Sequence, residues 1–94
     1  MLEVAQLSVL PESADTFAAA YARGVPFLSA SPGFRSARLV RGVESPSSFM
    51  LFVEWDSLAA HEAFRAGEGF GGWRGEVGPH FATPPHVEHF TDVG

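Results

Sequence analysis

The sequence predicts an α+β fold, a ferredoxin-like protomer in which an antiparallel sheet carries its helices on one face. Strand-like and helix-like segments follow one another in the order β-α-β-β-α-β, which is the split βαβ arrangement. One of the strands is apolar on both faces. The 94 residues contain no cysteine, so packing and association must supply the stability that disulfides give other small domains.

The first strand is expected in residues 2–10, and the first helix runs from Ser13 to Leu28. Residues 2–10 are rich in Leu and Val with polar residues interleaved, as in a strand. Gln6 is an amide on a side of this strand that is otherwise apolar, and a buried amide needs partners. Ser13 is a candidate N-cap, and apolar residues recur after it at helical spacing. We expect a disturbance near Pro26, because proline removes a helical hydrogen bond.

Three further strands are predicted at residues 34–41, 49–55 and 86–93. The alternation of apolar and other residues indicates the first and the last of these. Residues 49–55 are apolar at six of seven positions, which indicates a strand buried on both faces. A second helix begins after its candidate N-cap, Asp56 or Ser57, and continues past a glycine-rich break as a short helical turn.

The predicted sheet has more apolar surface than two helices can cover. With both helices on one face, the other face of a doubly apolar strand is left open, and a large apolar patch of this kind marks an interaction site. A second copy that packs sheet to sheet would cover it. We therefore expect one domain over residues 1–94 that works as a homodimer through its sheet face.

The charge of the chain disfavours several classes of partner. Six arginines and no lysine stand against eleven acidic residues, which gives a formal net charge of −5. The arginines do not cluster, so nucleic acid is not expected as a partner. No stretch approaches the roughly 20 apolar residues that span a bilayer, and the first residues do not resemble a signal peptide, so no membrane association and a cytoplasmic location are expected.

Four histidines, His61, His80, His86 and His89, raise the question of a metal site. His86 and His89 are three positions apart on a predicted strand and should project to opposite faces. The sequence therefore favours histidines that are exposed or hydrogen-bonded near a strand end, and no metal is expected.

Softer candidates for a site lie on the second helical segment. Helical spacing sets His61 between Leu58 and Phe64, which should face the sheet, so His61 is either a proton acceptor in an apolar setting or a hydrogen-bonded histidine at a helix edge. Trp73 and Arg74 follow within an aromatic group, and an arginine among aromatic walls is typical of a pocket for a flat, partly anionic molecule. The same group can also be plain core. Its other members are Phe64, Phe70, His80 and Phe81.

The chain resembles the antibiotic biosynthesis monooxygenase (ABM) family of dimeric α/β barrels over essentially its whole length. The segments that carry the resemblance are PGF (32–34), LVR (39–41), FVEWDSLAAH (52–61), FGGWR (70–74) and VEHF (87–90). The most specific element is the strand that ends in Trp55-x-Ser57 before a helix, with a Phe-x-x-Trp-Arg turn downstream.

This resemblance implies a dimeric α/β barrel with a pocket between sheet and helices in each subunit. Several members oxygenate aromatic phenols or quinols with no metal or flavin, and others cleave haem. For the first activity, the resemblance implies that Arg74 and Gln6 stabilise the oxyanion and that His61 takes the proton. Aromatic side chains would hold the rings, with no cofactor required.

The sequence departs from both kinds of relative. Haem-degrading members carry Asn, Trp and His where this chain has Gln6, Phe64 and Arg74, which argues against haem. Quinol-oxidising members commonly carry a histidine where Phe64 stands, and His61 lies one turn earlier.

Three functions stay open: a cofactor-independent oxygenase for a hydroxylated aromatic or quinol, a non-catalytic binding module for a hydrophobic ligand, and isomerisation or decarboxylation of a small carbonyl compound.

Overall fold

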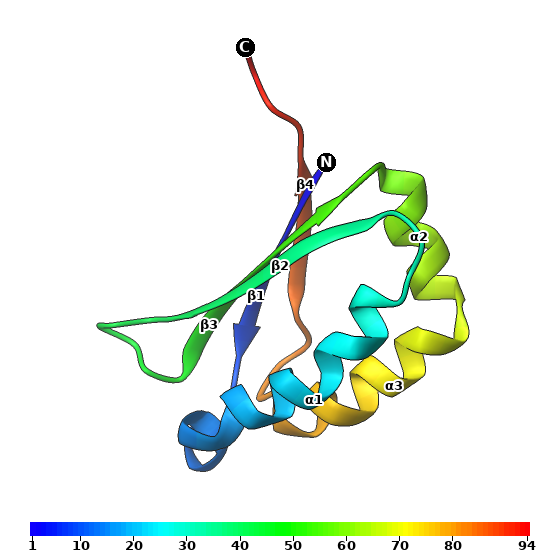
Figure 1. Ribbon diagram of the computed structural model, residues 1–94. Helices are drawn as coiled ribbons and strands as arrows, with labels where there is room; N and C mark the ends of the chain where they lie inside the picture. The colour runs from blue at the N-terminus through cyan, green and yellow to red at the C-terminus, as the bar shows by residue number, and fades with distance from the viewer.

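The computed structural model describes residues 1–94 and consists of one antiparallel sheet with helices on one face (Figure 1). The strand order is β2-β3-β1-β4, and every neighbouring pair is antiparallel. This confirms the predicted ferredoxin-like fold. The elements are β1 (Leu2–Ser8), the 3-10 helix η1 (Pro11–Thr16), α1 (Phe17–Ser29), β2 (Phe34–Arg41), β3 (Ser48–Trp55), α2 (Leu58–Ala66), α3 (Glu68–Val77), the 3-10 helix η2 (Gly78–His80) and β4 (His86–Phe90). No helix is long and apolar enough to cross a membrane.

The first helical segment differs from the prediction at both ends. Pro11 opens a 3-10 helix, so α1 starts only at Phe17, and the Ser13 side chain caps neither helix. Pro26 lies inside α1 without ending it, because the helix runs to Ser29 and the N–H of Ala30 still bonds to the Pro26 carbonyl at 3.1 Å. The disturbance expected at Pro26 therefore leaves the helix continuous.

The second helical segment forms two helices, separated at Gly67. Ser57 is the N-cap of α2, since its Oγ accepts a hydrogen bond from the Ala60 N–H at 3.1 Å. His61 is buried as expected, but Leu58 is 44% exposed and is not part of the core. Leu58 occupies the first position of α2, where its side chain is only partly covered.

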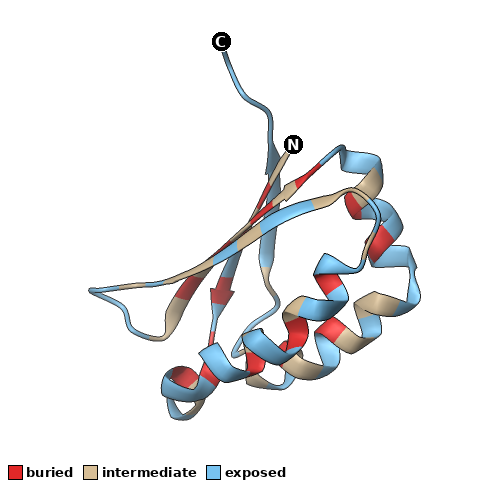
Figure 2. Ribbon diagram, in the orientation of Figure 1, coloured by how far each residue is buried: buried red, intermediate tan, exposed pale blue.

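The core lies between the sheet and the helices (Figure 2), and the two central strands, β1 and β3, contribute alternate residues to it. In β3 the core residues are Phe49, Leu51, Val53 and Trp55. In β1 the residues that face the helices are Glu3, Ala5 and Leu7.

The opposite face of the sheet is open in the single chain. Its centre carries apolar side chains that are half-buried or exposed, so β3 is fully buried on one face only. These apolar residues are Leu2, Val4, Val40, Met50, Phe52 and Phe90. Gln6 and Ser8 of β1 share this face and are exposed.

Candidate functional site

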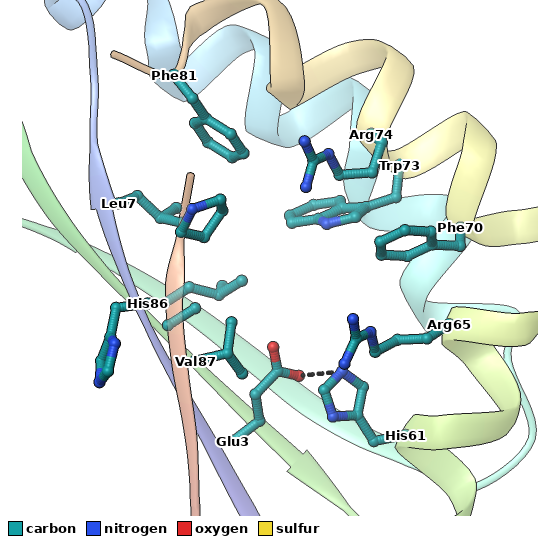
Figure 3. A pocket seen from close by; sticks show the side chains of 13 residues that line it. Glu3, Leu7, His61, Arg65, Phe70, Trp73, Arg74, Phe81, His86 and Val87 are labelled. Carbon is teal, nitrogen blue, oxygen red and sulfur yellow. Dashed lines mark ion pairs between the residues drawn. The ribbon is translucent and has the colours of Figure 1, made fainter. Parts of the chain in front are cut away.

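A cavity of about 400 Å³ lies between the inner face of the sheet and helices α2 and α3 (Figure 3). This volume is in the range of small-molecule sites. One side of the cavity is the sheet, and the other carries aromatic and cationic side chains of the helices. The lining residues are Glu3, Ala5, Leu7, Leu51, His61, Arg65, Phe70, Trp73, Arg74, Phe81, Pro85, His86 and Val87.

Glu3 places a buried carboxylate in this cavity. The residue is only 6% exposed, and its Oε1 accepts a hydrogen bond from Trp55 Nε1 at 2.9 Å and lies 3.3 Å from His61 Nε2. No protein group bonds to the second oxygen, and Figure 3 shows that oxygen turned towards the cavity. Burial raises the pKa of the Glu3 carboxyl, and the Trp55 hydrogen bond and the charges of His89 and Arg65 oppose this rise only in part.

His61 joins this carboxylate to β4. Its ring stacks on Trp55, with 5.3 Å between the centroids, and its Nδ1 lies 2.8 Å from His89 Nε2. Burial, together with the charges of His89 and Arg65, lowers the pKa of His61 from 6.5 to about 4, so this imidazole is neutral at pH 7. When Glu3 is ionised it can only accept, and His61 Nε2 then donates to it while Nδ1 accepts from His89. The result is an ordered chain from the exposed His89 to the cavity.

Two arginines, Arg65 of α2 and Arg74 of α3, direct their guanidinium groups into the cavity (Figure 3). Neither forms an ion pair with a carboxylate, whereas Arg23, Arg35 and Arg41 each pair with an acidic side chain elsewhere. Arg74 lies over the ring of Phe81 at 5.4 Å. The cavity therefore offers a ligand two cations that form no ion pair.

The histidines do not gather into a metal site. Glu3 and His89 contact opposite nitrogens of the His61 ring, so the three side chains cannot share one ion. His86 points to the other face of β4 and bonds to Glu88. No group of three or more potential ligands has a suitable geometry.

The structure brings together most of the residues that the sequence singled out. Five of them line the cavity: His61, Phe70, Trp73, Arg74 and Phe81. Phe64 is buried behind the wall, against Trp55 and Phe70, and His80 packs edge-on against Phe17.

Gln6 was placed wrongly by the sequence interpretation. It lies on the open face of the sheet, on the far side from His61 and Arg74. Each of the two alternating sets in residues 2–9 contains polar as well as apolar residues, so periodicity alone could not decide which set faces the helices.

Sequence reasoning also missed Glu3 and Arg65, and it considered His89 only as a metal ligand or a histidine near a strand end, not as a partner of His61. Glu3 shares its face of the strand with Ala5, Leu7 and Val9. These apolar neighbours were the signal that could have placed Glu3 on the core side. Arg65 lies one helical turn after His61, which puts both on one face of α2. The contact between His61 and His89 joins a helix to an edge strand, and local patterns carry no signal for such a pair.

Comparisons with known proteins agree with this architecture. The family model described as antibiotic biosynthesis monooxygenase matches residues 1–76. The uncharacterized protein YczJ of Bacillus subtilis (strain 168) is 29% identical over 92 residues, which cover 97% of each chain. A crystal structure from Bordetella bronchiseptica, assigned to the antibiotic biosynthesis monooxygenases, is 33% identical with a TM-score of 0.93 and covers 98% of this chain and 95% of its own.

A more distant solved structure shares the fold. SnoaB, a cofactor-independent oxygenase from Streptomyces nogalater, is 18% identical with a TM-score of 0.80, over 98% of this chain and 93% of its own. At this identity the likeness concerns the fold alone.

Proposed function

The chain belongs to the antibiotic biosynthesis monooxygenase family, and we propose that it is a cofactor-independent monooxygenase for a hydroxylated aromatic or quinol-type small molecule. The observation that carries this proposal is the Glu3 carboxylate, which is buried, bonded through one oxygen and open to the cavity through the other. A carboxylate with a raised pKa, next to aromatic walls and unpaired cations, suits the removal of a phenolic proton.

In the proposed reaction, the free oxygen of Glu3 accepts the proton of the substrate hydroxyl. The positive charge of Arg65, which also acts on Glu3 and His61, stabilises the phenolate. The electron-rich anion then reduces O2 directly. For a substrate with a conjugated ring CH2 group, as in an anthrone, one oxygen atom becomes the carbonyl of that carbon and the other leaves as water, so the two C–H bonds supply every electron.

His61 and His89 give the proton a route back to solvent. Once Glu3 is protonated, the relay uses the other tautomer of His61: bare Nε2 accepts the Glu3 proton while Nδ1 donates its own proton to His89. His89 is exposed on β4 and exchanges with water. In this assignment His61 relays the proton, and Glu3 takes the role that the sequence interpretation gave to the histidine.

The test is oxygen uptake with a panel of anthrones and hydroquinones. We expect Glu3→Gln to lower the rate by about 10²- to 10⁴-fold, the usual contribution of a general base. Glu62→Gln is the matched control, because it makes the same change on an exposed position of α2. An unchanged rate in Glu3→Gln would refute the assignment, and tight binding without uptake would favour a non-catalytic binding module.

We also propose that the protein is a homodimer in which the open sheet faces of two copies pack together. The apolar centre of this face, with Val4, Met50 and Phe52, is flanked by Arg38 and Glu88, so a two-fold contact can pair unlike charges. Light scattering should give twice the 10.1 kDa chain mass. Phe52→Glu should give monomers, whereas Val43→Glu, at a hairpin residue that is 88% exposed, should not. A wild-type monomer at micromolar concentration would contradict the proposal.

A further inference from the structure

The cavity is positively charged within an acidic protein. Its ionisable lining consists of Glu3, two arginines and a neutral His61, because the His86 side chain points away, so its formal charge is +1. The whole chain carries −5. A neutral ligand would gain nothing from this contrast, whereas an anion is attracted to the cavity and repelled by the rest of the surface.

The two arginines stand at different ends of the cavity. The charge of Arg65 acts on both Glu3 and His61, whereas Arg74 perturbs the pKa of neither. Arg74 instead lies over Phe81, and its guanidinium also packs close to Gly78. Figure 3 shows Arg65 beside His61 and Arg74 beside Phe81, with Phe70 between the two arginines along the wall.

One developing oxyanion needs only one of these cations. Arg65 is next to the proton acceptor, so it is placed to stabilise the phenolate that forms there. Arg74 is left without a carboxylate partner at the other end of an aromatic wall. A guanidinium with free donors pairs best with a planar oxyanion such as a carboxylate, which it can bind through two hydrogen bonds.

We propose that the ligand is a flat aromatic acid whose carboxylate binds Arg74 and whose acidic hydroxyl lies beside Glu3 and Arg65. This inference deepens the proposed function, and it rests on that function for the hydroxyl end only. The carboxylate orients the ring system, so that the hydroxyl proton is presented to the free oxygen of Glu3.

The test is a binding experiment that needs no turnover. The probes are anthraquinone-2-carboxylate and its carboxamide, which have nearly the same shape and differ in charge. Trp73 lines the cavity, so quenching of its fluorescence reports binding, and calorimetry gives the Kd. We expect the acid to bind about 10-fold or more tightly than the amide at pH 7, as one charged hydrogen bond provides, and the difference to shrink with salt.

Variants assign the preference to its residue. Arg74→Gln should reduce the affinity for the acid to that for the amide and leave the amide unchanged, and Arg74→Lys should keep part of the preference. Arg23→Gln, which removes a guanidinium that pairs with Glu76 outside the cavity, should change neither affinity.

Three outcomes would overturn this inference. They are equal affinity for acid and amide in the wild type, a preference that survives in Arg74→Gln, and a preference that is lost equally in Arg23→Gln. Failure of the oxygenase proposal looks different, because the protein would then bind the acid selectively through Arg74 and show no oxygen uptake with any member of the panel.

Discussion

Replacing His61 with glutamine tests the electrostatics of the site through protein stability. The burial that lowers the pKa of His61 from 6.5 to about 4 penalises its charged form. Because the folded-state pKa is depressed, His61 contributes stability that is complete above pH 6.5 and is lost as the pH falls through 4. At about 1.4 kcal/mol per pKa unit, the full contribution is about 3 kcal/mol, of which about 2 kcal/mol is lost between pH 7 and pH 4.5.

The groups around His61 come from four elements. They are Glu3 of β1, the Trp55 ring of β3, Arg65 of the same helix and His89 of β4. The pKa of Glu3 is raised, so its own contribution has the opposite sign and grows as the pH falls. Glu3 is present in both proteins, and the glutamine amide can still donate to it, so the comparison of wild type with His61→Gln mainly reports the titration of the histidine.

The assay is urea unfolding at equal protein concentration from pH 7 to pH 4.5, followed by circular dichroism. Between these limits the wild type should lose about 2 kcal/mol more than His61→Gln. The exposed His86→Gln is the control and should follow the wild type, because its side chain points away from the cavity. Parallel pH profiles for wild type and His61→Gln would refute the buried, neutral imidazole.

Three substitutions test the packing that holds the site. Gly24→Ala should destabilise the folded protein by about 1–3 kcal/mol, because the new Cβ would lie 2.8 Å from the Trp73 ring in the cavity wall. The same substitution should shift the fluorescence of Trp73. Gly75→Ala should stabilise α3 by about 0.5–1 kcal/mol, since its Cβ meets nothing within 4 Å; a loss of stability would contradict this. Ser57→Ala should cost about 1 kcal/mol through the lost cap on Ala60, and thermal unfolding measures all three.

The sequence predicted the fold well because local patterns define its elements. The strand over 34–41 and the short helix after the glycine break were both found, since alternation and helical spacing are properties of neighbouring residues. The start of the first helix was missed because Pro11 favours a 3-10 turn, which an N-cap pattern at Ser13 does not reveal.

The site was predicted only in its helical half. His61, Phe70, Trp73 and Arg74 were found because helical spacing places them on one side of two consecutive helices. The prediction for the strand was wrong, because it chose Gln6 of β1 and the cavity is lined by Glu3. A shift of one residue changes the face of every side chain on β1, and both faces are largely apolar. A face that binds a partner copy would need this apolar character as well, so the proposed dimer explains why the alternation was uninformative.

The burial of Glu3 separates a functional role from a structural one. Trp55 and His61 contact one oxygen of the Glu3 carboxyl, and the second oxygen is left to the cavity. Burial raises the pKa of this carboxyl, which means that the folded protein disfavours its ionised form. Above the raised pKa, Glu3→Gln should therefore make the protein more stable, and the gain should vanish below pH 4.5, where the carboxyl is protonated in both states. A variant that is more stable at pH 8 but inactive would identify Glu3 as a group retained for chemistry. If Glu3→Gln were less stable than the wild type at pH 8, the carboxylate would instead be a structural partner of Trp55 and His61.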